Sequence, residues 1–215
     1  MRAVAWDIDG TLIDSEPLHH RALLAASLTL GTDLSDLPDQ AFRGIHMHEV
    51  WDLLRPRLRE NLTQDEWLRA IDEHYAANLD ALVPIVDAVA TVRALDAIGV
   101  PQACVSNSGR AVVDANLAAL GIADIIRFSI SFDDVTEGKP SPQPYLLACE
   151  RLGLPPGEVV AVEDSRSGAL SARRAGLVVV GYAPQDAPLE DVDASISDFT
   201  QFAGLARKWW TPESA

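Results

Sequence analysis

Asp7 and Asp9, near the N-terminus, have residue types and a spacing that could do chemistry. They follow a predicted strand at residues 1–6, and Gly10 comes directly after them. Because alternate residues of an extended chain point to the same side, we expect the two carboxylates to converge. Adjacent carboxylates repel each other unless a cation or a shared proton intervenes, and Mg²⁺ prefers hard oxygen ligands. A carboxylate can also attack phosphorus, whereas the plainer interpretation is a polar turn.

A turn with two hydroxyl groups, at residues 106–109, follows the strand expected at 102–105. Hydroxyl and main-chain N–H groups at the start of a helix can bind an anion, although the same residues would also serve as a simple helix cap. Lys139 lies between a glycine and a proline and is one of only two lysines in the chain. Its charge could neutralise a phosphate group and an attacking carboxylate, or it could be an ordinary loop lysine.

Glu163 and Asp164 directly follow the apolar run at residues 159–162. Two consecutive carboxylates at the end of a buried strand are costly unless a metal ion binds them; the alternative is an exposed acidic helix cap. Each polar cluster therefore falls at the end of a predicted strand. Because open α/β sheets bind ligands beyond the carboxyl ends of their strands, we expect the clusters to meet and to complete an oxygen-rich magnesium site.

Two patterns of secondary structure are expected to position these clusters. Residues 15–83 show only helical spacing, with helices predicted at 18–30, 50–58 and 67–75, the last preceded by a cap at Thr63. From Pro84 onward strands and helices alternate, which predicts a parallel sheet with helices on both faces. Strands are expected at 1–6, 102–105, 127–132, 159–162 and 177–181. Helices are expected at 86–98, 112–120, 144–152 and 167–175, the last three ending at Gly121, Gly153 and Gly176.

This division predicts an α/β core formed by residues 1–14 and 84–215, with residues 15–83 inserted as a helical cap. A chain of 215 residues with 48% hydrophobic content can bury one sizeable core and a small second lobe. The segment after Pro184 is less regular. Its Trp209 and Trp210 either dock on the core or form a contact with another chain.

Composition restricts the partners and the compartment. The formal net charge of −15 would repel nucleic acid, so we expect none as a partner. No apolar run approaches the roughly 20 residues of a membrane span, and no secretory signal is visible. Cys104 and Cys149 lie in apolar stretches and are predicted to be buried free thiols in a reducing compartment. We therefore expect a cytoplasmic protein without a membrane partner, either a monomer or a small homo-oligomer.

The motifs taken together resemble the haloacid-dehalogenase-like (HAD) hydrolase superfamily. The string Asp-Ile-Asp-Gly-Thr-Leu at residues 7–12, the Ser-Asn pair at 106–107, Lys139 and the string Glu-Asp-Ser at 163–165 occur in the family's order, and the resemblance covers nearly the whole chain. The insertion resembles the helical cap of the subgroup that contains phosphoglycolate phosphatases and β-phosphoglucomutases. The implied fold is a Rossmann-like parallel sheet core with an inserted four-helix cap.

The resemblance also implies roles for individual residues. Asp7 would be the nucleophile, and Asp9 would protonate the leaving oxygen and then activate water against a phospho-aspartate. Ser106 and Asn107 would bind the transferring phosphoryl group, and Lys139 would bind it too and stabilise its charge. This assignment matches phosphoryl transfer, in which positioning and charge neutralisation supply most of the catalysis.

A magnesium ion is the implied cofactor. The resemblance assigns it the carboxylates of Asp7, Glu163 and Asp164 and the main-chain carbonyl of Asp9. The presence of Asp9 also argues against a true dehalogenase, which generally lacks the second aspartate. Residues 15–83 contain no lysine, which argues against the phosphonatase branch, because that branch needs a Schiff-base lysine in its cap.

Phosphatase and phosphomutase are harder to separate. His19 occupies the place of a cap-hinge histidine known in the mutases, but this position recurs in related phosphatases. Arg43 fits a basic position of the mutase cap, whereas Met47 stands where a second cation is expected, although His48 is adjacent. We therefore favour simple hydrolysis of a small phosphorylated metabolite. A sugar phosphomutase, or a catalytically silent binding protein on the same fold, are the alternatives.

Four residues are the candidates for substrate contacts in the cap, with the hinge residue included: His19, Arg43, His46 and His48.

Overall fold

The computed structural model describes residues 1–39, 41–42, 45, 47–184 and 189–210. The chain divides into two compact units. One comprises Met1–Ile13 and Pro84–Ala215, and the other comprises Asp14–Val83. We call the first the α/β unit and the second the helical insertion.

A six-stranded parallel sheet forms the centre of the α/β unit, in the strand order β5-β4-β1-β6-β7-β8. The strands are β1 (Ala3–Trp6), β4 (Gln102–Val105), β5 (Ser129–Ile130), β6 (Val159–Glu163), β7 (Val178–Tyr182) and β8 (Ala194–Ile196). β1 lies between β4 and β6, with Val4 opposite both Gln102 and Val160. The first strand of the chain is therefore central, and its carboxyl end has a strand end on each side.

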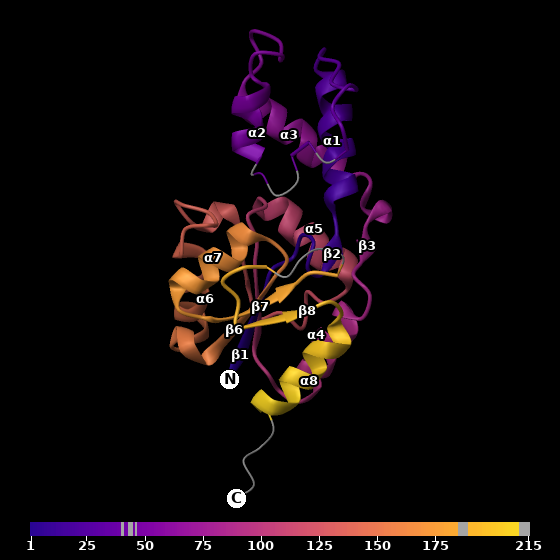
Figure 1. The fold of residues 1–215 in the computed structure, drawn as a ribbon. Coiled ribbons are helices and arrows are strands. Elements are labelled where there is room, and N and C mark those ends of the chain that lie inside the picture. Colours follow the sequence, from indigo (N-terminus) through magenta and orange to yellow (C-terminus); the bar gives the residue numbers. More distant parts are fainter. Residues whose placement is uncertain (40, 43–44, 46, 185–188, 211–215) are drawn as a thin grey trace, which may run out of the picture. The chain divides into compact units, whose positions relative to one another are not determined.

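Helices cover both faces of this sheet, as the alternating pattern predicts. Figure 1 shows α6 and α7 against one face and α4 and α8 against the other. Every residue of β1, β4 and β6 is buried, and all of these residues except Gln102 and Glu163 are apolar, as expected for strands that are covered on both faces. The helices are α4 (Ala88–Ala97), α5 (Arg110–Leu120), α6 (Gln143–Leu152), α7 (Arg166–Ala175) and α8 (Phe199–Trp210). Three of them, α5, α6 and α7, end at left-handed glycines, as predicted: Gly121, Gly153 and Gly176.

The helical insertion consists of α1 (Glu16–Thr29), α2 (Met47–Leu54) and α3 (Gln64–Ala76), with a short 3-10 helix at Leu79–Ala81. The buried indole of Trp67 on α3 donates a 2.9 Å hydrogen bond to Ser27 on α1, and its ring lies 5.6 Å from that of Trp51 on α2. Thr63 caps α3 by accepting a hydrogen bond from the Glu66 N–H, as predicted. The two segments through which the chain enters and leaves the insertion pair as a two-stranded sheet, formed by β2 (Ile13–Asp14) and β3 (Val83–Pro84).

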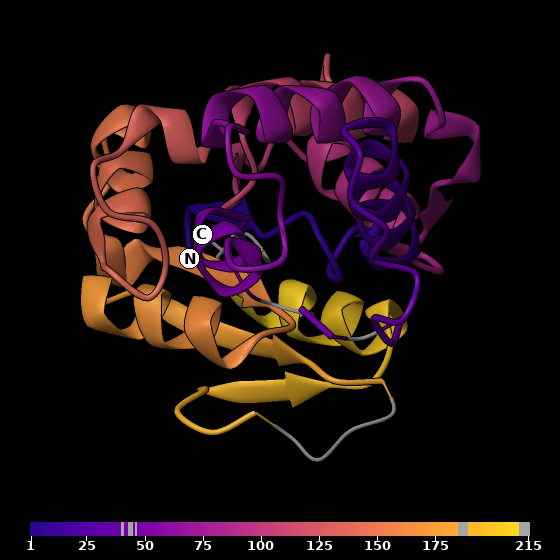
Figure 2. The same ribbon diagram turned by 90° about the horizontal axis from the view of Figure 1, so that it is seen from above.

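The prediction of an irregular segment after Pro184 is wrong for the part that the structure describes. β8 joins the sheet beside β7 (Figure 2), and α8 packs two buried phenylalanines, Phe199 and Phe202, near the Trp6 ring, at centroid distances of 6.1 and 5.2 Å. A strand of three residues is too short to show alternation, so its position at the sheet edge was not visible in the sequence. Trp209 lies on α8 with its ring 6.3 Å from that of Phe202.

The strand expected at 127–132 is shorter in the structure, where only Ser129–Ile130 pairs with β4. A 3-10 helix at Phe132–Asp134 follows, and Ser131 and Asp134 form a reciprocal capping box around it. A polar side chain that binds the main chain of this turn competes with continued strand pairing.

Both cysteines are buried free thiols, as predicted. Burial raises the pKa of the Cys149 thiol to about 11, and it also raises the pKa of Cys104. Within the described residues, none of the helices combines the length and the apolar character needed to traverse a bilayer.

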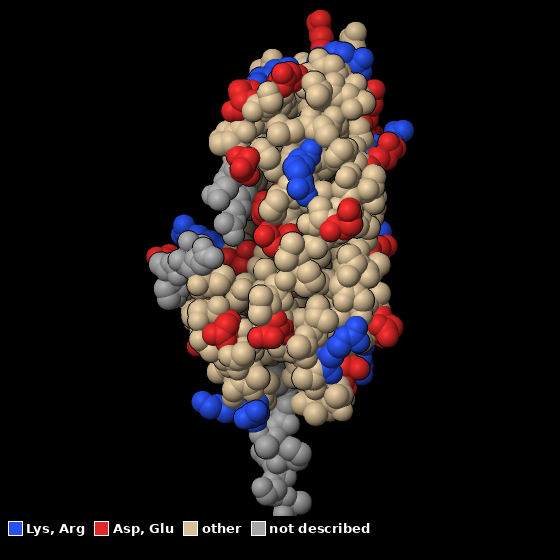
Figure 3. Space-filling model, turned by 90° about the vertical axis from the view of Figure 1, so that its right-hand side faces the viewer, with Lys and Arg blue, Asp and Glu red and all other residues tan. Residues whose placement is uncertain are grey.

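Charge is spread thinly over the surface that Figure 3 displays. Acidic side chains are distributed among uncharged atoms, and basic side chains form small separate groups. On that face, a phosphate polymer would meet no continuous basic surface.

Candidate active site

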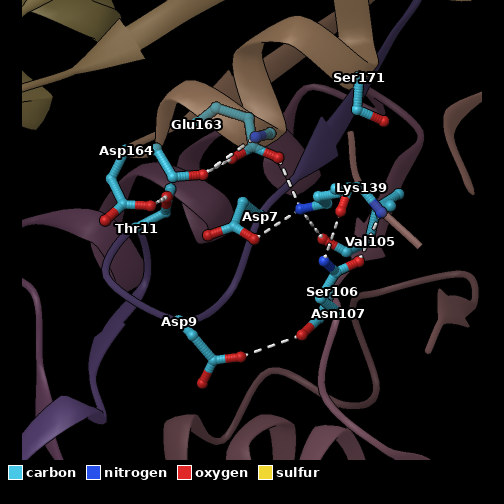
Figure 4. A network of polar contacts seen from close by, with 12 residues as sticks. Asp7, Asp9, Thr11, Val105, Ser106, Asn107, Lys139, Glu163, Asp164 and Ser171 are labelled. Carbon is cyan, nitrogen blue, oxygen red and sulfur yellow. Dashed lines mark hydrogen bonds and ion pairs between the residues drawn. The ribbon is translucent and has the colours of Figure 1, made fainter. Parts of the chain in front are cut away.

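Lys139 links the carboxyl ends of three adjacent strands (Figure 4). Its Nζ donates hydrogen bonds to Asp7 Oδ1 after β1 at 2.7 Å, to the Val105 carbonyl at the end of β4 at 2.8 Å, and to Glu163 Oε1 at the end of β6 at 2.6 Å. Only 4% of the lysine side chain is exposed. The ammonium group thus has three acceptors, one for each of its N–H bonds. The polar segments at the ends of β1, β4 and β6, which were predicted to lie close together, contact the same lysine.

Three carboxylates gather beside this ammonium group. Asp7, Glu163 and Asp164 each offer an oxygen atom, and these atoms all lie within 4.8 Å of one another. Three negative charges against one positive charge leave a net charge of −2 when all the groups are ionised. Asp7 Oδ2 is buried and has no hydrogen-bond partner within the described structure. An unsatisfied buried carboxylate oxygen among acidic neighbours fits a hard divalent cation, so this cluster can hold a metal ion.

The electrostatics of Asp7 point in the same direction. Burial raises the pKa of Asp7 well above its ordinary value. Lys139 opposes this rise, whereas Glu163 and Asp164 add to it. Burial alone would lower the pKa of the Lys139 ammonium, but the two carboxylates that it contacts raise it, so the lysine stays charged. A further positive charge near Asp7 would favour its ionised form, which is the form able to act as a nucleophile.

Gly10 and Gly168 allow the chain to approach these carboxylates closely. Gly10 has φ of 85°, and a Cβ there would lie 2.1 Å from Asp164 Oδ2. A Cβ on Gly168, in the first turn of α7, would lie 1.8 Å from Glu163 Oε2. Side chains at either position would collide with the acidic cluster, so both glycines are needed where they stand.

Asp9 has a different set of partners from Asp7. Its Oδ2 accepts hydrogen bonds from the hydroxyls of Ser106 at 3.0 Å and Ser108 at 2.9 Å, and its Oδ1 accepts one from Asn116 Nδ2 at 3.0 Å. Figure 4 shows this carboxylate turned toward the Ser106 turn. Alternation along an extended chain predicted that both carboxylates would converge. Here the side-chain oxygens of Asp9 are not among the three grouped carboxylates.

The turn after β4 holds two predicted phosphate ligands in different ways. Ser106 is buried, and its oxygen also accepts a hydrogen bond from the Ser108 N–H at 2.9 Å. The side-chain amide of Asn107 accepts from the Lys139 N–H at 2.8 Å and donates to the Lys139 carbonyl at 3.0 Å. The asparagine side chain therefore fixes the loop that carries the lysine.

Two buried residues at the site were missed by the sequence reasoning, Tyr145 and Asn116. The Tyr145 hydroxyl on α6 donates a 2.5 Å hydrogen bond to Glu163 Oε1, and Lys139 Nζ lies 5.3 Å from the centroid of its ring. Tyrosine in an apolar helical pattern gives no signal of its own. Asn116 does give one, because it is an amide at a fully buried position of α5, next to Leu117.

The four candidate substrate residues belong to the helical insertion or lie outside the described residues. The His19 ring packs against the buried Tyr75 at a centroid distance of 4.5 Å. His48 is exposed on α2. Arg43 and His46 lie outside the described residues. For all four residues, contact with a substrate stays a prediction.

Comparison with known proteins matches residues 1–176 to the family described as haloacid dehalogenase-like hydrolase. The chain is 31% identical to hexitol phosphatase A of Escherichia coli (strain K12) over 201 residues, which cover 91% of this chain and 90% of that protein. It is 30% identical to phosphoglycolate phosphatase of Neisseria meningitidis over 189 residues, with 84% and 80% covered. The crystal structure of CbbY from Rhodobacter sphaeroides in complex with phosphate has a TM-score of 0.86 and 25% identity, with 94% of this chain and 96% of that chain covered.

Proposed function

Because the chain belongs to the haloacid dehalogenase-like hydrolases, we propose that it is a Mg²⁺-dependent phosphatase that hydrolyses a small phosphomonoester through a phospho-aspartate at Asp7. The observation that carries this proposal is the state of Asp7 itself. One oxygen is paired with Lys139, while the other is buried beside Glu163 and Asp164 and has no hydrogen-bond partner among the described residues. Both features suit a nucleophile held next to a cation.

In the first step, an Asp7 carboxylate oxygen attacks phosphorus, and a bond forms between them. The bond from phosphorus to the alcohol oxygen of the substrate breaks, and Asp9 donates a proton to that oxygen, so the alcohol leaves neutral. Lys139 keeps its proton in this step, because the carboxylates of Asp7 and Glu163 raise the pKa of its ammonium group. It stabilises the negative charge that spreads over the transferring group.

In the second step, Asp9, now ionised, accepts a proton from a water molecule while the water oxygen attacks phosphorus. The bond between phosphorus and Asp7 breaks, which releases inorganic phosphate and restores the carboxylate. Ser106 and the Asn107 turn bind the phosphoryl oxygens through hydroxyl and main-chain N–H groups. The same two aspartates thus serve both steps.

Magnesium would be held by Asp7, Glu163, Asp164 and the main-chain carbonyl of Asp9. When bound, the ion supplies positive charge that offsets the repulsion among the carboxylates and the phosphate. The grouping of three carboxylates supports this choice, and oxygen-only ligands favour magnesium over softer metals.

Small phosphorylated metabolites are the proposed substrates. Two phosphatases that resemble this chain support this class, because their names refer to hexitol phosphates and to phosphoglycolate. We propose that His19, Arg43, His46 and His48 of the helical insertion select among them. The buried free thiols support a reducing compartment, and a cytoplasmic location is proposed on that basis.

The deciding experiment measures inorganic phosphate released from a panel of phosphorylated metabolites. We expect release that stops with a chelator and returns with Mg²⁺, and a loss of at least about 10³-fold in the Asp7→Asn protein. Asp114→Asn makes the same chemical change at an exposed position of α5 and should keep full activity. An active Asp7→Asn protein would overturn the mechanism. Isomerised sugar phosphate without net phosphate release would indicate the phosphomutase instead.

A further inference from the structure

Asn116 is a polar residue in an apolar environment. Its side chain is fully buried, and its helix neighbours Val113 and Leu117 are also buried. An amide in such surroundings is costly unless its donors and acceptor find partners. The amide nitrogen of Asn116 donates to Asp9 Oδ1 at 3.0 Å, and this contact joins residues 107 positions apart in the chain. The contact therefore arises from the tertiary fold, not from the local geometry of α5.

The orientation of this amide follows from hydrogen-bond chemistry. An ionised carboxylate can only accept hydrogen bonds, so the group facing Asp9 Oδ1 must be the amide N–H and not the amide oxygen. That N–H can only donate. Ser106 and Ser108, which face Oδ2, carry hydroxyl groups that can donate or accept. The two oxygens of Asp9 therefore meet different chemistry.

This difference matters if Asp9 transfers protons. A proton on Oδ1 that pointed along the amide N–H would place two hydrogens against each other, and the N–H cannot turn into an acceptor. An oxygen that faces rotatable hydroxyl groups can gain or lose a proton, because the hydroxyls can turn. Oδ1 is thus suited to stay an acceptor throughout the reaction, and Oδ2 is suited to exchange the proton.

Ser106 adds a link to substrate binding. Its hydroxyl donates to Asp9 Oδ2 in this structure, and it is also a proposed ligand of the phosphoryl group. A phosphoryl oxygen that accepts this hydroxyl hydrogen would remove one donor from Oδ2. The hydrogen bonds from Asn116 to Oδ1 and from Ser108 to Oδ2 would remain, so the carboxylate would keep its position while Oδ2 became available.

We propose that Asn116 is a positioning residue for Asp9. It fixes Oδ1 and, with Ser108, presents Oδ2 as the oxygen that gives a proton to the leaving group and later takes one from water. This inference rests on the proposed function, because it assumes that Asp9 is the general acid and base.

The test uses leaving groups that differ in their need for a proton. Benzyl, phenyl and p-nitrophenyl phosphate are similar in shape, but benzyl alcohol is a poor leaving group unless protonated, whereas p-nitrophenolate leaves unaided. The measurement is kcat/KM for each substrate, because this parameter covers the steps up to formation of the phospho-aspartate. In Asn116→Leu we expect a loss of roughly 10- to 100-fold for benzyl phosphate and under about threefold for p-nitrophenyl phosphate, with phenyl phosphate between them.

Two further variants keep the test decisive. Asn116→Asp preserves the size of the side chain but places a carboxylate against Asp9, and it should show the same dependence on the leaving group. Ser108→Ala removes a hydroxyl from a partly exposed turn, so it should fold, and it should show a smaller loss, of about threefold for benzyl phosphate. Gln102→Leu is the matched control. It removes a buried amide that binds Trp6 and Val92 and should shift all three substrates equally.

Asp9→Asn sets the reference for these comparisons and should show the largest dependence on the leaving group. If Asp9→Asn shows that dependence but the Asn116 variants lose activity equally on all three phosphates, Asn116 has a purely structural role and the inference is overturned. If Asp9→Asn itself shows no such dependence, the proposed role of Asp9 fails and the inference fails with it.

Discussion

Two clusters at the same edge of the sheet hold their carboxylates by opposite means. Around Asp7, a buried ammonium group from Lys139 supplies the main favourable contact, and one carboxylate oxygen lacks a hydrogen-bond partner in the part of the chain that the structure describes. Around Asp9, the donors are neutral hydroxyl and amide groups, from Ser106, Ser108 and Asn116, and both oxygens are occupied. We call these the charged cluster and the neutral cluster.

One sheet edge can thus give two neighbouring aspartates distinct roles. An ion pair with Lys139 and one carboxylate oxygen left to react suit a group that must remain ionised and attack phosphorus. Neutral donors that can reorient suit a group that must gain and lose a proton. The environment, not the residue type, separates the two aspartates.

Removing the ammonium group of Lys139 should have the largest effect on the charged cluster. Lys139→Met should leave the buried carboxylates of Asp7 and Glu163 without their positive partner, so it should lower activity by at least about 10³-fold and the free energy of unfolding by about 3–5 kcal/mol. Urea unfolding and phosphate release measure the two effects. The matched control is Lys208→Met, at the other lysine of the chain. A Lys139→Met protein of unchanged stability would contradict the view that charge holds this cluster together.

Tyr145→Phe should sharpen the description of the charged cluster with a smaller effect. The loss of one hydrogen bond to Glu163 should lower kcat about fivefold, leave KM unchanged, and reduce stability by about 1–2 kcal/mol. The effect should vanish in a Glu163→Leu background, because leucine offers no acceptor and the hydrogen bond of the tyrosine hydroxyl to this site goes to Glu163. Additive losses in the double variant would show that Tyr145 acts by another route.

A third charged group, far more exposed to solvent than Lys139, tests whether burial is what makes charge effective. Asp134 in the turn after β5 accepts hydrogen bonds from the Ser131 N–H and hydroxyl and pairs with Arg110. Burial by itself would raise its pKa, but these contacts lower the pKa of Asp134 to about 2 from an ordinary 3.8. A lowered pKa means that the ionised form stabilises the fold above pH 3.8, and this stabilisation is lost as the pH falls from 3.8 toward 2.

Asp134→Asn should therefore reduce stability by about 1 kcal/mol at pH 7, and the gap to the parent protein should close between about pH 4 and pH 2. Thermal unfolding across that range measures it. Asp114→Asn is the control, because Asp114 also pairs with Arg110 but its side chain is 63% exposed, compared with 23% for Asp134. A gap that widens on acidification would contradict the sign of this prediction.

The sequence by itself determined the parallel core, because apolar runs and helical spacing are local patterns that the chain states directly. It also determined where Asp7, Ser106 and Glu163 would stand, since each lies at the carboxyl end of a buried strand. The ends of parallel strands must meet at one sheet edge, so their proximity needed no coordinates. Lys139 was predicted to belong to the same site because it lies in an unusual loop, between a glycine and a proline, and because the family resemblance assigns it a role there.

Only the tertiary structure decided which atom contacts which. Alternation along the chain predicted that the side chains of Asp7 and Asp9 point to one side. In the structure, the Asp9 carboxylate accepts hydrogen bonds from a turn and a helix that are distant in the sequence, at Ser108 and Asn116. β8 was invisible because a strand of three residues carries no periodic signal, whereas α8 is a helix of 12 residues that the prediction missed. Tyr145 and Asn116 stand within helices that look like ordinary core. Their roles depend on which group faces them across the fold, and a one-dimensional pattern does not contain that information.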